Sequence, residues 1–399
     1  MKCRVCDSKD LDFVIDLGNQ PWCNNFLKES ELGKEPYYPL RVVFCNKCKT
    51  SQLDFTVKKE VMFGDHTYLS GVTKSLSSHF KNVANEIDKK FFETQVNKSI
   101  LDIGSNDGTQ LQHFKNIGYE VLGVESSKRT AEIANKRGIR TLNEFFNEKL
   151  MDKINRKFDI FNASGVFFHL EELHSVCQGI KKGLKENGVF IVQFLYMKSI
   201  MDNLAFDQIY HEHLLYYTLH SIEYLLAIHG LSMFDGYLSS IHGGSIIGFI
   251  SHKGKKNKTK RLLELIKIEE NSQCNEIEYY LRFRRNIEIM KKNNIDYIDS
   301  KLSESKTIYG FGAPVKGNTL LNYFEVGVDR IKYLVEKNEL RRGLYSPGKH
   351  IPILIEDEVE KLPDVYYVLA WNFKKEILKN NKDLIDKGVE FYFPVNPPE

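Results

Sequence analysis

Two Cys-x-x-Cys pairs near the start of the chain, Cys3–Cys6 and Cys45–Cys48, constrain how its first segment can fold. Each pair can offer two thiolates to one tetrahedral zinc ion, with Zn–S bonds of about 2.3 Å. A metal held by two distant pairs closes the chain on itself and replaces the hydrophobic core that so short a segment lacks. Four cysteines complete the coordination of the ion, so we expect a structural zinc site. The alternative is a set of reduced, unligated cysteines.

Length and charge bound the rest of the chain. At 399 residues it is too long for one ordinary core, so we expect two or three domains. The net charge of +3 gives no case for a nucleic-acid partner. No apolar run approaches the ~18 residues that a membrane span needs, and the opening MKCRVCDSKD contains no apolar signal region. These features predict a cytoplasmic protein, where a reducing environment favours cysteines as metal ligands.

Strand-like and helix-like segments alternate over residues 67–252. The runs SILDIGS, YEVLGVE, FDIFNAS and GVFIVQFL are short and strand-like, and helix-like stretches such as SKRTAEIANKRG lie between them. This alternation is typical of a parallel sheet with helices on both faces. We therefore expect the central part of the chain to be an α/β domain.

A highly charged segment, 253–305, follows this region. Its run KGKKNKTKR could be a basic patch for nucleic acid, but a solvated loop leading into a helix is the simpler interpretation. The stretch NEIEYYLRFRRNIEIMKKNN fits a helical connector. From Lys306 the alternation returns in KTIYGFGAP, RIKYLVE and VYYVLAW, which predicts a second, smaller α/β unit. The expected divisions are 1–66, 67–252, 253–305 and 306–399.

A glycine turn joins a strand to a helix in ILDIGSNDGTQLQHF. A dinucleotide site favours GxGxxG, which lets a pyrophosphate rest on the helix N-terminus. This turn instead carries an extra acid, Asp107, which disfavours a pyrophosphate and suits the cationic sulfonium and ammonium groups of S-adenosylmethionine. An acid at the end of the next strand can bind ribose hydroxyls. The predicted cofactor contacts are Asp102, Gly104, Asn106, Gly108, Glu125 and Asn162.

The segment FDQIYHEHLLYYTL is unusually rich in histidine and tyrosine. His211 and His213 suggest a metal pair, but the sequence supplies no third ligand at a suitable spacing. Proton chemistry is the alternative. His213 can take a proton near pH 7, Glu212 can fix its tautomer, and Tyr210 can steady an enolate oxygen. A polar, hydrogen-bonded core cluster is a third interpretation, and the choice of base between the two histidines stays open.

Several motifs follow one another along the chain: the two cysteine pairs, HTYLSG, LDIGSNDG, IYHEHLLYYTL, IHGGS, YGFGAPVKGNTLLN, YSPGKHIP and LAWNF. With them the chain resembles the nucleotide-sugar C-methyltransferases of deoxysugar pathways over essentially its whole length. The resemblance implies an α/β fold with a small zinc-binding N-terminal domain, a central Rossmann-like S-adenosylmethionine domain and a C-terminal Rossmann-like domain. The chain departs from the family at NASGVFFH and at Ile246-Ile247, where a Leu-Arg pair is usual, which could alter how the sugar is held.

The resemblance also implies a reaction. A base removes the acidified hydrogen beside the ketone of a 4-keto sugar, and the carbon of the resulting enolate attacks the methyl group of S-adenosylmethionine. By motif, His213 is the implied base, with Tyr210 and Glu212 as its supports. His169 in VFFHLEEL is implied to assist at the substrate oxygen, and Tyr68 in HTYLSG to line the site.

The C-terminal unit supplies the implied substrate contacts, because a cation, backbone N–H groups and an amide suit phosphate. These residues are Lys316, Gly317, Asn318, Arg341, Tyr345 and His350. The alternative is a glycine turn that binds nothing. We expect a monomer or weak oligomer whose partner is a nucleotide sugar, and neither nucleic acid nor a membrane, acting in surface-glycan or secondary-metabolite sugar biosynthesis.

Three other functions compete with this interpretation. A methyltransferase acting on an oxygen or nitrogen of a sugar would share the cofactor turn but needs no enolate-stabilising tyrosine. An NAD-dependent oxidoreductase could use one of the two glycine turns. A non-catalytic zinc-ribbon binding module would explain the cysteines, but not the presence of Tyr210, Glu212 and His213 together.

Overall fold

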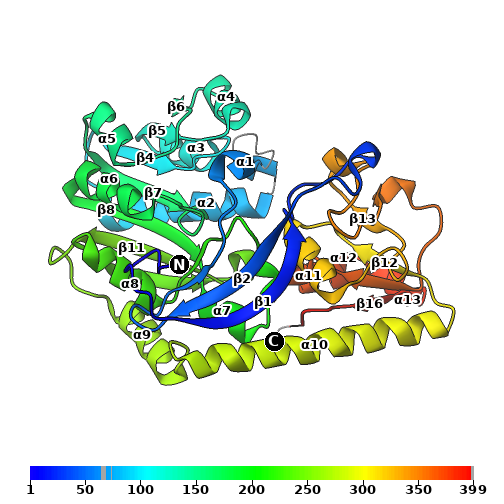
Figure 1. The fold of residues 1–399 in the computed structure, drawn as a ribbon. Helices are drawn as coiled ribbons and strands as arrows, with labels where there is room; N and C mark the ends of the chain where they lie inside the picture. The colour runs from blue at the N-terminus through cyan, green and yellow to red at the C-terminus, as the bar shows by residue number, and fades with distance from the viewer. Residues whose placement is uncertain (64–68, 73, 397–399) are drawn as a thin grey trace.

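The computed structural model describes residues 1–63, 69–72 and 74–396, and it arranges their strands in three sheets. Figure 1 shows a long N-terminal hairpin that crosses from the large central sheet toward the smaller C-terminal unit, with one long helix running beneath both. Within the described ranges, we find no helix with the length and apolar character needed to cross a membrane.

The N-terminal segment forms a four-stranded antiparallel sheet. Its strands, in spatial order, are β1 (Leu11–Pro21), β2 (Tyr37–Cys45), β3 (Ser51–Leu53) and β9 (Leu215–Tyr216). The last strand comes from much later in the chain, since Ser51 pairs with Tyr216 and Gln52 with Leu215. The sheet therefore joins the N-terminal segment to the polar segment FDQIYHEHLLYYTL of the central region.

The four cysteines predicted to bind zinc meet at the end of β2. Their Sγ atoms all lie within 4.8 Å of one another, and all four are free thiols. Both Cys-x-x-Cys pairs use the same turn. Asp7 and Lys49 have φ values of 55° and 59°, and each donates its N–H to the carbonyl of the cysteine four residues earlier, at 3.0 and 2.8 Å. Four converging thiols in matched turns fit one tetrahedral zinc ion.

The central region forms a seven-stranded sheet in the order β10-β11-β8-β7-β4-β5-β6. Strands β4 to β8 pair in parallel, and β11 and β10 extend the sheet with antiparallel pairing. The bounds are β4 (Ser99–Ile103), β5 (Glu120–Val124), β6 (Thr141–Leu142), β7 (Phe158–Ser164), β8 (Leu184–Leu195), β10 (Leu231–Ser239) and β11 (Ser245–His252). The four strands predicted from the sequence are β4, β5, β7 and β8, so that prediction is confirmed.

Helices cover both faces of this sheet. Neighbouring residues of β4 belong to different buried clusters: Ile100 packs with Val83 and Leu111, whereas Leu101 packs with Val176. The helices are α1 (Lys59–Phe63), α2 (Lys74–Ile87), α3 (Thr109–Asn116), α4 (Lys128–Lys136), α5 (Glu148–Ile154), α6 (Leu173–Gly183), α7 (Met197–Asp202) and α8 (Leu219–Ile228). The strand order reverses between β4 and β7, and such a reversal leaves a ligand crevice at the carboxyl ends of the strands.

The C-terminal unit is a second α/β sheet, with all strands parallel in the order β14-β13-β12-β15-β16. The strands are β12 (Ile308–Phe311), β13 (Leu334–Glu336), β14 (Ile353–Ile355), β15 (Val365–Val368) and β16 (Glu390–Tyr392). Its helices are α11 (Val315–Phe324), α12 (Lys374–Asn380) and α13 (Lys382–Asp386), and they are preceded in the chain by α9 (Lys260–Ser272), which packs against β10, and by α10 (Ile277–Ser303). The predicted strands after Lys306 are β12, β13 and β15, which confirms a second Rossmann-like unit.

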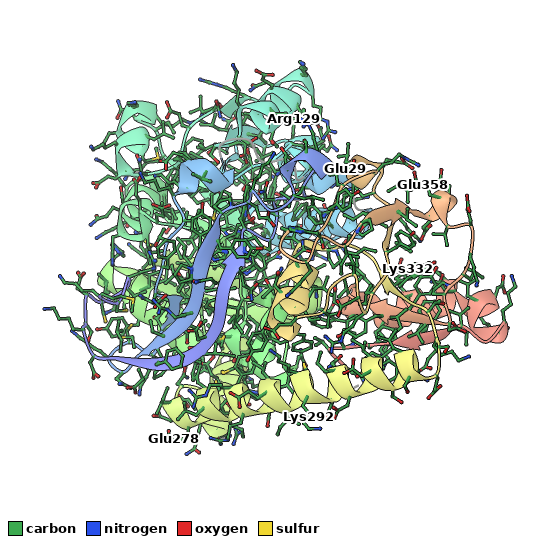
Figure 2. All side chains as sticks on the ribbon, turned by 45° about the vertical axis from the view of Figure 1, so that its right-hand side comes forward. Glu29, Arg129, Glu278, Lys292, Lys332 and Glu358 are labelled. Atoms are coloured by element: carbon green, nitrogen blue, oxygen red, sulfur yellow. The ribbon has the colours of Figure 1, made fainter. Side chains whose placement is uncertain are left out.

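Helix α10 links the first and third sheets. The ring of Tyr280 lies 4.7 Å from that of Phe44 on β2, and Asn294 Oδ1 accepts a hydrogen bond from the Tyr367 hydroxyl on β15 at 2.8 Å. Figure 2 shows Glu278 and Lys292 on the outer side of the same helix, and both are exposed. One polar and one packed face let α10 act as a brace between the two ends of the molecule.

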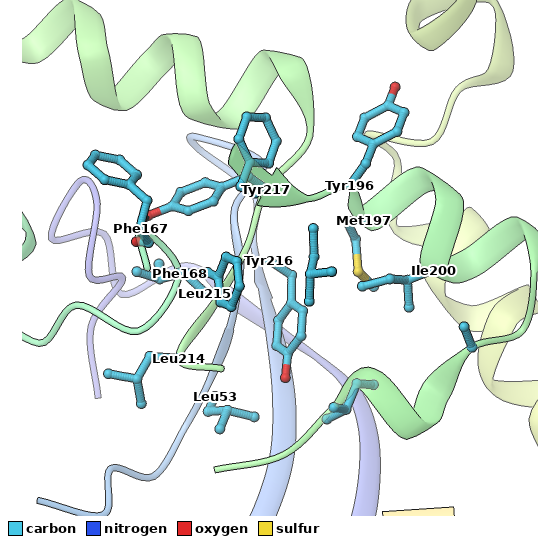
Figure 3. Packing of buried hydrophobic residues seen from close by; sticks show 14 of the residues in the cluster. Leu53, Phe167, Phe168, Tyr196, Met197, Ile200, Leu214, Leu215, Tyr216 and Tyr217 are labelled. Carbon is cyan, nitrogen blue, oxygen red and sulfur yellow. Dashed lines mark hydrogen bonds between the residues drawn. The ribbon is translucent and has the colours of Figure 1, made fainter. Parts of the chain in front are cut away.

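Residues Leu214 to Tyr217, which include β9, belong to the main hydrophobic core. Figure 3 shows them beside Leu53 of β3 and the rings of Phe167 and Phe168, and each of the four is at most 1% exposed. Burial of one such side chain stabilises a fold by about 1.5–3 kcal/mol. The backbone just after the predicted active-site histidines is therefore firmly anchored.

We predict that replacing Cys45 by serine lowers bound zinc below one ion per chain and reduces the free energy of unfolding by several kcal/mol, on the order of what metal binding contributes to folding. Zinc content by mass spectrometry and a thermal melt measure both effects. Cys177→Ala, at a buried cysteine outside the cluster, is the matched control and should keep its zinc. Full zinc occupancy in Cys45→Ser would contradict the assignment.

Candidate active site

The predicted cofactor residues meet at the carboxyl ends of β4, β5 and β7. Asp102 on β4 stands opposite Asn162 on β7, and the Asn162 amide donates to Asp102 Oδ1 at 2.5 Å. A small cavity opens beside them, lined by Ser70, Phe80, Asp102, Gly104, Ser105, Asn106, Gln110 and Ser164. The structure thus brings Asp102, Gly104 and Asn106 to one cavity.

Glu125 holds the glycine turn in place. Its two carboxylate oxygens accept the backbone N–H groups of Asn106 at 2.9 Å and Ser127 at 2.8 Å. Each oxygen keeps a further lone pair for a ligand hydroxyl. Gly104 has φ of 68°, and a Cβ there would lie 2.5 Å from the Val166 side chain, so only glycine fits. Gly108, with φ of 77°, begins α3 but faces Ile139 instead of the cavity.

The charge of this crevice favours a cationic ligand. Asp102 is 3% exposed and Glu125 8% exposed. Burial raises the pKa of both carboxyls, that of Asp102 to about 7. A bound cation would favour their ionised forms, whereas a pyrophosphate would meet two acids. The residues present therefore fit S-adenosylmethionine, whose ammonium and sulfonium groups are positive and whose ribose carries hydroxyls.

Asp107, the acid expected to face the cationic ligand, has a different role. It is fully buried, and its carboxylate accepts hydrogen bonds from Arg137 Nη1 at 2.9 Å and Thr109 Oγ1 at 2.7 Å. It also accepts the Gly71 N–H at 3.1 Å. Asp107 thus stabilises the start of α3, and Asp102 is the acid that lines the cavity. The expectation was wrong because nothing in the sequence indicates that Arg137, thirty residues later, pairs with Asp107.

His213 is buried and its tautomer is fixed. Its Nδ1 donates to the backbone carbonyl of Gln208 at 2.7 Å, because a carbonyl can only accept. In the neutral ring Nε2 is then the basic nitrogen. The Tyr210 ring lies 3.8 Å from the His213 ring, and burial raises the pKa of the Tyr210 phenol well above its ordinary value.

His169 lies next to His213. It sits on the loop after β7, and its ring centre is 5.1 Å from that of His213. Its Nδ1 donates to the backbone carbonyl of Glu212 at 2.5 Å, so this ring takes the same tautomer. Two histidines from separate segments therefore present the same kind of basic nitrogen in one place.

Glu212 does not fix the tautomer of His213, contrary to expectation. Its carboxyl is 6% exposed and accepts the indole N–H of Trp22 at 2.7 Å. Burial raises its pKa to about 7. Adjacent side chains in a turn point in different directions, so Glu212 does not reach His213. The backbone carbonyl of Gln208 fixes the His213 tautomer instead.

His211 points away from His213, toward the N-terminal hairpin. Its Nε2 lies 3.3 Å from the carbonyl of Tyr38, and its ring packs edge-on against the Tyr38 ring at 5.7 Å. Burial lowers its pKa to about 4, so the ring is neutral. Among the described residues, the four cysteines alone form a cluster that could hold a metal ion. The two histidines therefore form no metal pair, and the geometry favours His213 as the base.

The implied phosphate contacts of α11 lie against other parts of the protein. Lys316 Nζ lies 3.5 Å from a carboxylate oxygen of Asp207. The Asn318 amide donates to the carbonyl of Cys23 at 2.7 Å, and the Gly317 N–H donates to that of Pro314 at 2.9 Å. The Gly317 and Asn318 donors are thus used within the protein, whereas Lys316 Nζ lies beside a buried acid without a hydrogen-bond partner among the described residues. The phosphate role of these three residues stays a prediction.

The other three implied substrate residues contact the tip of the N-terminal hairpin. The Arg341 guanidinium lies 3.6 Å from the ring centre of Phe26, Tyr345 pairs with Leu27, and His350 Nε2 is 2.5 Å from Glu35 Oε1. The hairpin tip and the C-terminal unit therefore form one continuous structure. Tyr68, the remaining predicted site residue, lies outside the described residues.

Two residues of this site had no sequence signal. Trp22 stands 190 positions from the carboxyl that it bonds, in a segment that carries no motif for catalysis. Gln208 acts through its backbone carbonyl, so the type of its side chain gives no hint of its role. Contacts of either kind come only from the tertiary structure.

Three family models match consecutive parts of the chain. They are described as a zinc binding domain over residues 3–63, a methyltransferase domain over 77–234 and a C-methyltransferase C-terminal domain over 240–396. A curated relative, the C-methyltransferase NovU of Streptomyces niveus, is 29% identical over 403 residues, which cover 100% of this chain and 96% of the relative.

Solved methyltransferase structures resemble part of the chain. Magnesium protoporphyrin IX methyltransferase of Synechocystis PCC 6803 with bound SAH is 13% identical and covers 47% of this chain and 90% of its own, at a TM-score of 0.37. The CcbJ methyltransferase of Streptomyces caelestis is 11% identical over 44% of this chain and 90% of its own, at a TM-score of 0.35. Likenesses this weak carry no argument, so the assignment rests on the family models and the curated relative. The chain belongs to the S-adenosylmethionine-dependent C-methyltransferases that join a zinc-binding domain, a methyltransferase domain and a C-methyltransferase C-terminal domain.

Proposed function

We propose that this enzyme transfers a methyl group to a carbon of a nucleotide-activated keto sugar, through an enolate. The observation that carries the proposal is the pair His213 and His169, whose rings lie 5.1 Å apart and whose Nδ1 atoms both donate to backbone carbonyls. Both rings therefore keep Nε2 basic, and removal of a carbon-bound hydrogen needs such a base. Transfer to a hydroxyl group needs no enolate.

His213 takes the proton from the carbon beside the ketone at its Nε2. Tyr210, whose ring centre lies 3.8 Å from that of His213, keeps its phenol protonated because burial raises its pKa, so it can donate a hydrogen bond to the developing enolate oxygen. His169 can support the same oxygen. When bound, S-adenosylmethionine supplies the electrophilic methyl group. Tyr68 remains a further proposed member of this site.

The loop after β7 supports this arrangement, because it connects the cofactor crevice with the histidines. Ser164 lines the cavity beside Asp102, and the Val166 side chain lies against Gly104. His169 follows three residues later and bonds to the backbone of Glu212. One short loop thus borders both the proposed methyl donor site and the proposed base, as a direct transfer between them needs.

We propose Arg341 as the main contact for the anionic part of the substrate. Its Nη1 is buried with no hydrogen-bond partner among the described residues, and the guanidinium lies over Phe26. Burial lowers its pKa to about 10, so it remains a cation at neutral pH. A diphosphate would supply the missing acceptor. Tyr345 and His350 support this site by holding the hairpin tip.

Four reduced thiols suit a reducing compartment, so we keep a cytoplasmic location as part of the proposal. We also keep the functional divisions 1–66, 67–252, 253–305 and 306–399. Their roles are zinc binding, cofactor binding, connection and sugar-nucleotide binding.

We predict that His213→Asn lowers the rate of methyl transfer at least 100-fold, because a general base contributes about 10²–10⁴-fold. The rate is measured with the keto-sugar nucleotide that a screen of thymidine- and guanosine-linked sugars selects. Affinity for S-adenosylhomocysteine should stay within twofold. His211→Asn is the matched control and should keep most of its activity; the opposite pattern would exchange the roles of the two histidines.

We predict that the affinity for S-adenosylhomocysteine falls below pH 7, by up to about tenfold per pH unit. The ligand ammonium favours ionised Asp102, whose pKa in the empty site burial raises to about 7, so binding at lower pH must first remove a proton. Calorimetry between pH 8 and 6 measures the slope. Asp102→Asn should bind more weakly and lose that slope. Binding of NAD in place of S-adenosylhomocysteine would indicate an oxidoreductase instead.

We predict that the enzyme with S-adenosylhomocysteine exchanges the carbon-bound hydrogen of the accepted keto sugar with deuterated water, and that His213→Asn does not. Exchange reports enolate formation without methyl transfer, and mass spectrometry or NMR detects it. If a sugar is methylated without such exchange, and the methyl group is found on oxygen or nitrogen, the result would support the competing methyltransferase function.

A further inference from the structure

Asp207 is a fully buried acid at the contact between the central domain and the C-terminal unit. It belongs to η4 (Phe206–Gln208) and is 0% exposed. Its Oδ2 accepts the indole N–H of Trp371 at 2.6 Å and lies 3.5 Å from Lys316 Nζ. Lys316 Nζ in turn lies 3.6 Å from the centre of the Trp371 ring. Both partners come from the C-terminal unit.

Such a contact is not explained by stability alone. Two buried charges give up hydration, and replacing them by apolar groups is often neutral or stabilising. Burial lowers the pKa of Lys316 to about 8 and raises that of Asp207, which reflects this cost. The main effect of this ion pair is therefore to fix the position of η4, because its net contribution to the free energy of unfolding is small.

The residue after Asp207 fixes the proposed base. Gln208 supplies the backbone carbonyl that accepts His213 Nδ1 at 2.7 Å. On the other side of Asp207, the Phe206 ring lies 5.5 Å from Tyr323 and 5.2 Å from Phe324, both on α11. The C-terminal unit thus contacts η4 at two successive residues, and the third holds the histidine.

We infer that Asp207 and Trp371 are positioning residues for His213: the indole hydrogen bond holds η4 so that the Gln208 carbonyl meets the histidine ring. The inference rests on the proposed role of His213 as the base. It gives the C-terminal unit a part in proton removal, separate from any contact with the sugar nucleotide. Neither residue touches the reacting atoms in this account.

Trp371→Phe tests the indole hydrogen bond and keeps an aromatic ring at this position. We expect the turnover number and the rate of hydrogen–deuterium exchange at the sugar carbon to fall together by about 10- to 100-fold, the effect of a displacement of about 1 Å in an active site. KM for S-adenosylmethionine and the melting temperature should change little. Tyr297→Phe is the matched control. It also removes a hydrogen-bond donor to a carboxylate, Glu390 on the edge strand β16, but it should leave turnover and exchange unchanged.

Two double variants separate geometry from charge. Asp207→Asn with Lys316→Met keeps an acceptor for the indole, and should keep the turnover number, measured at saturating sugar nucleotide, within about fivefold of the parent. Asp207→Ala with Lys316→Met removes that acceptor at the same net charge. Its turnover and exchange rates should fall as far as those of Trp371→Phe. If the alanine variant does not fold, Trp371→Phe decides.

Unchanged turnover and exchange in Trp371→Phe and in the alanine double variant would overturn the inference, provided that His213→Asn is inactive. A fall in turnover without a fall in exchange would also overturn it, since the defect would then lie outside proton removal. Full activity in His213→Asn would instead refute the assignment of the base, so the two failures are distinguishable.

Discussion

The short antiparallel pairing of β3 with β9 is the constraint on which the rest of the active site depends. Ser51 and Gln52 pair with Tyr216 and Leu215, and Leu53 donates its N–H to the carbonyl of Leu214 at 3.0 Å. The cysteine cluster closes the turn before β3, and β9 begins two residues after His213. A structural zinc site thus supports the histidine segment through one edge of a sheet. Four thiolates complete the coordination of such an ion, which suits a structural role.

The N-terminal hairpin extends this support to the third domain. Trp22, just past the end of β1, bonds to Glu212, while Cys23 and Leu27 bond to Asn318 and Tyr345 of the C-terminal unit. The hairpin reaches from the central region to the C-terminal unit, and α10 runs beneath both (Figure 1). Burial of the site residues excludes water, which strengthens hydrogen bonds and charges in the site. This explains why so many of its polar groups have shifted pKa values.

Local patterns predicted much of this structure, and distant contacts account for what they missed. Period and composition identified β4, β5, β7, β8 and the second sheet, and the cysteine spacing identified the zinc site, because these depend on neighbours in sequence. The predicted cofactor turn also forms a cavity around Asp102. The partners of Asp107, Glu212 and Lys316 were beyond prediction. Each partner is a single side chain far away in the sequence, and neither residue type nor spacing predicts which side chains will meet.

A crystal structure of the enzyme with S-adenosylhomocysteine and the accepted sugar nucleotide tests the central claim most directly. The distances to measure run from the sugar carbon beside the ketone to His213 Nε2 and to the cofactor sulfur. We predict that Nε2 lies within about 3.5 Å of that carbon or its hydrogen, and that the sulfur faces the same carbon. A hydroxyl or amino group of the sugar facing the sulfur, with His213 remote from the carbon, would contradict C-methylation through an enolate.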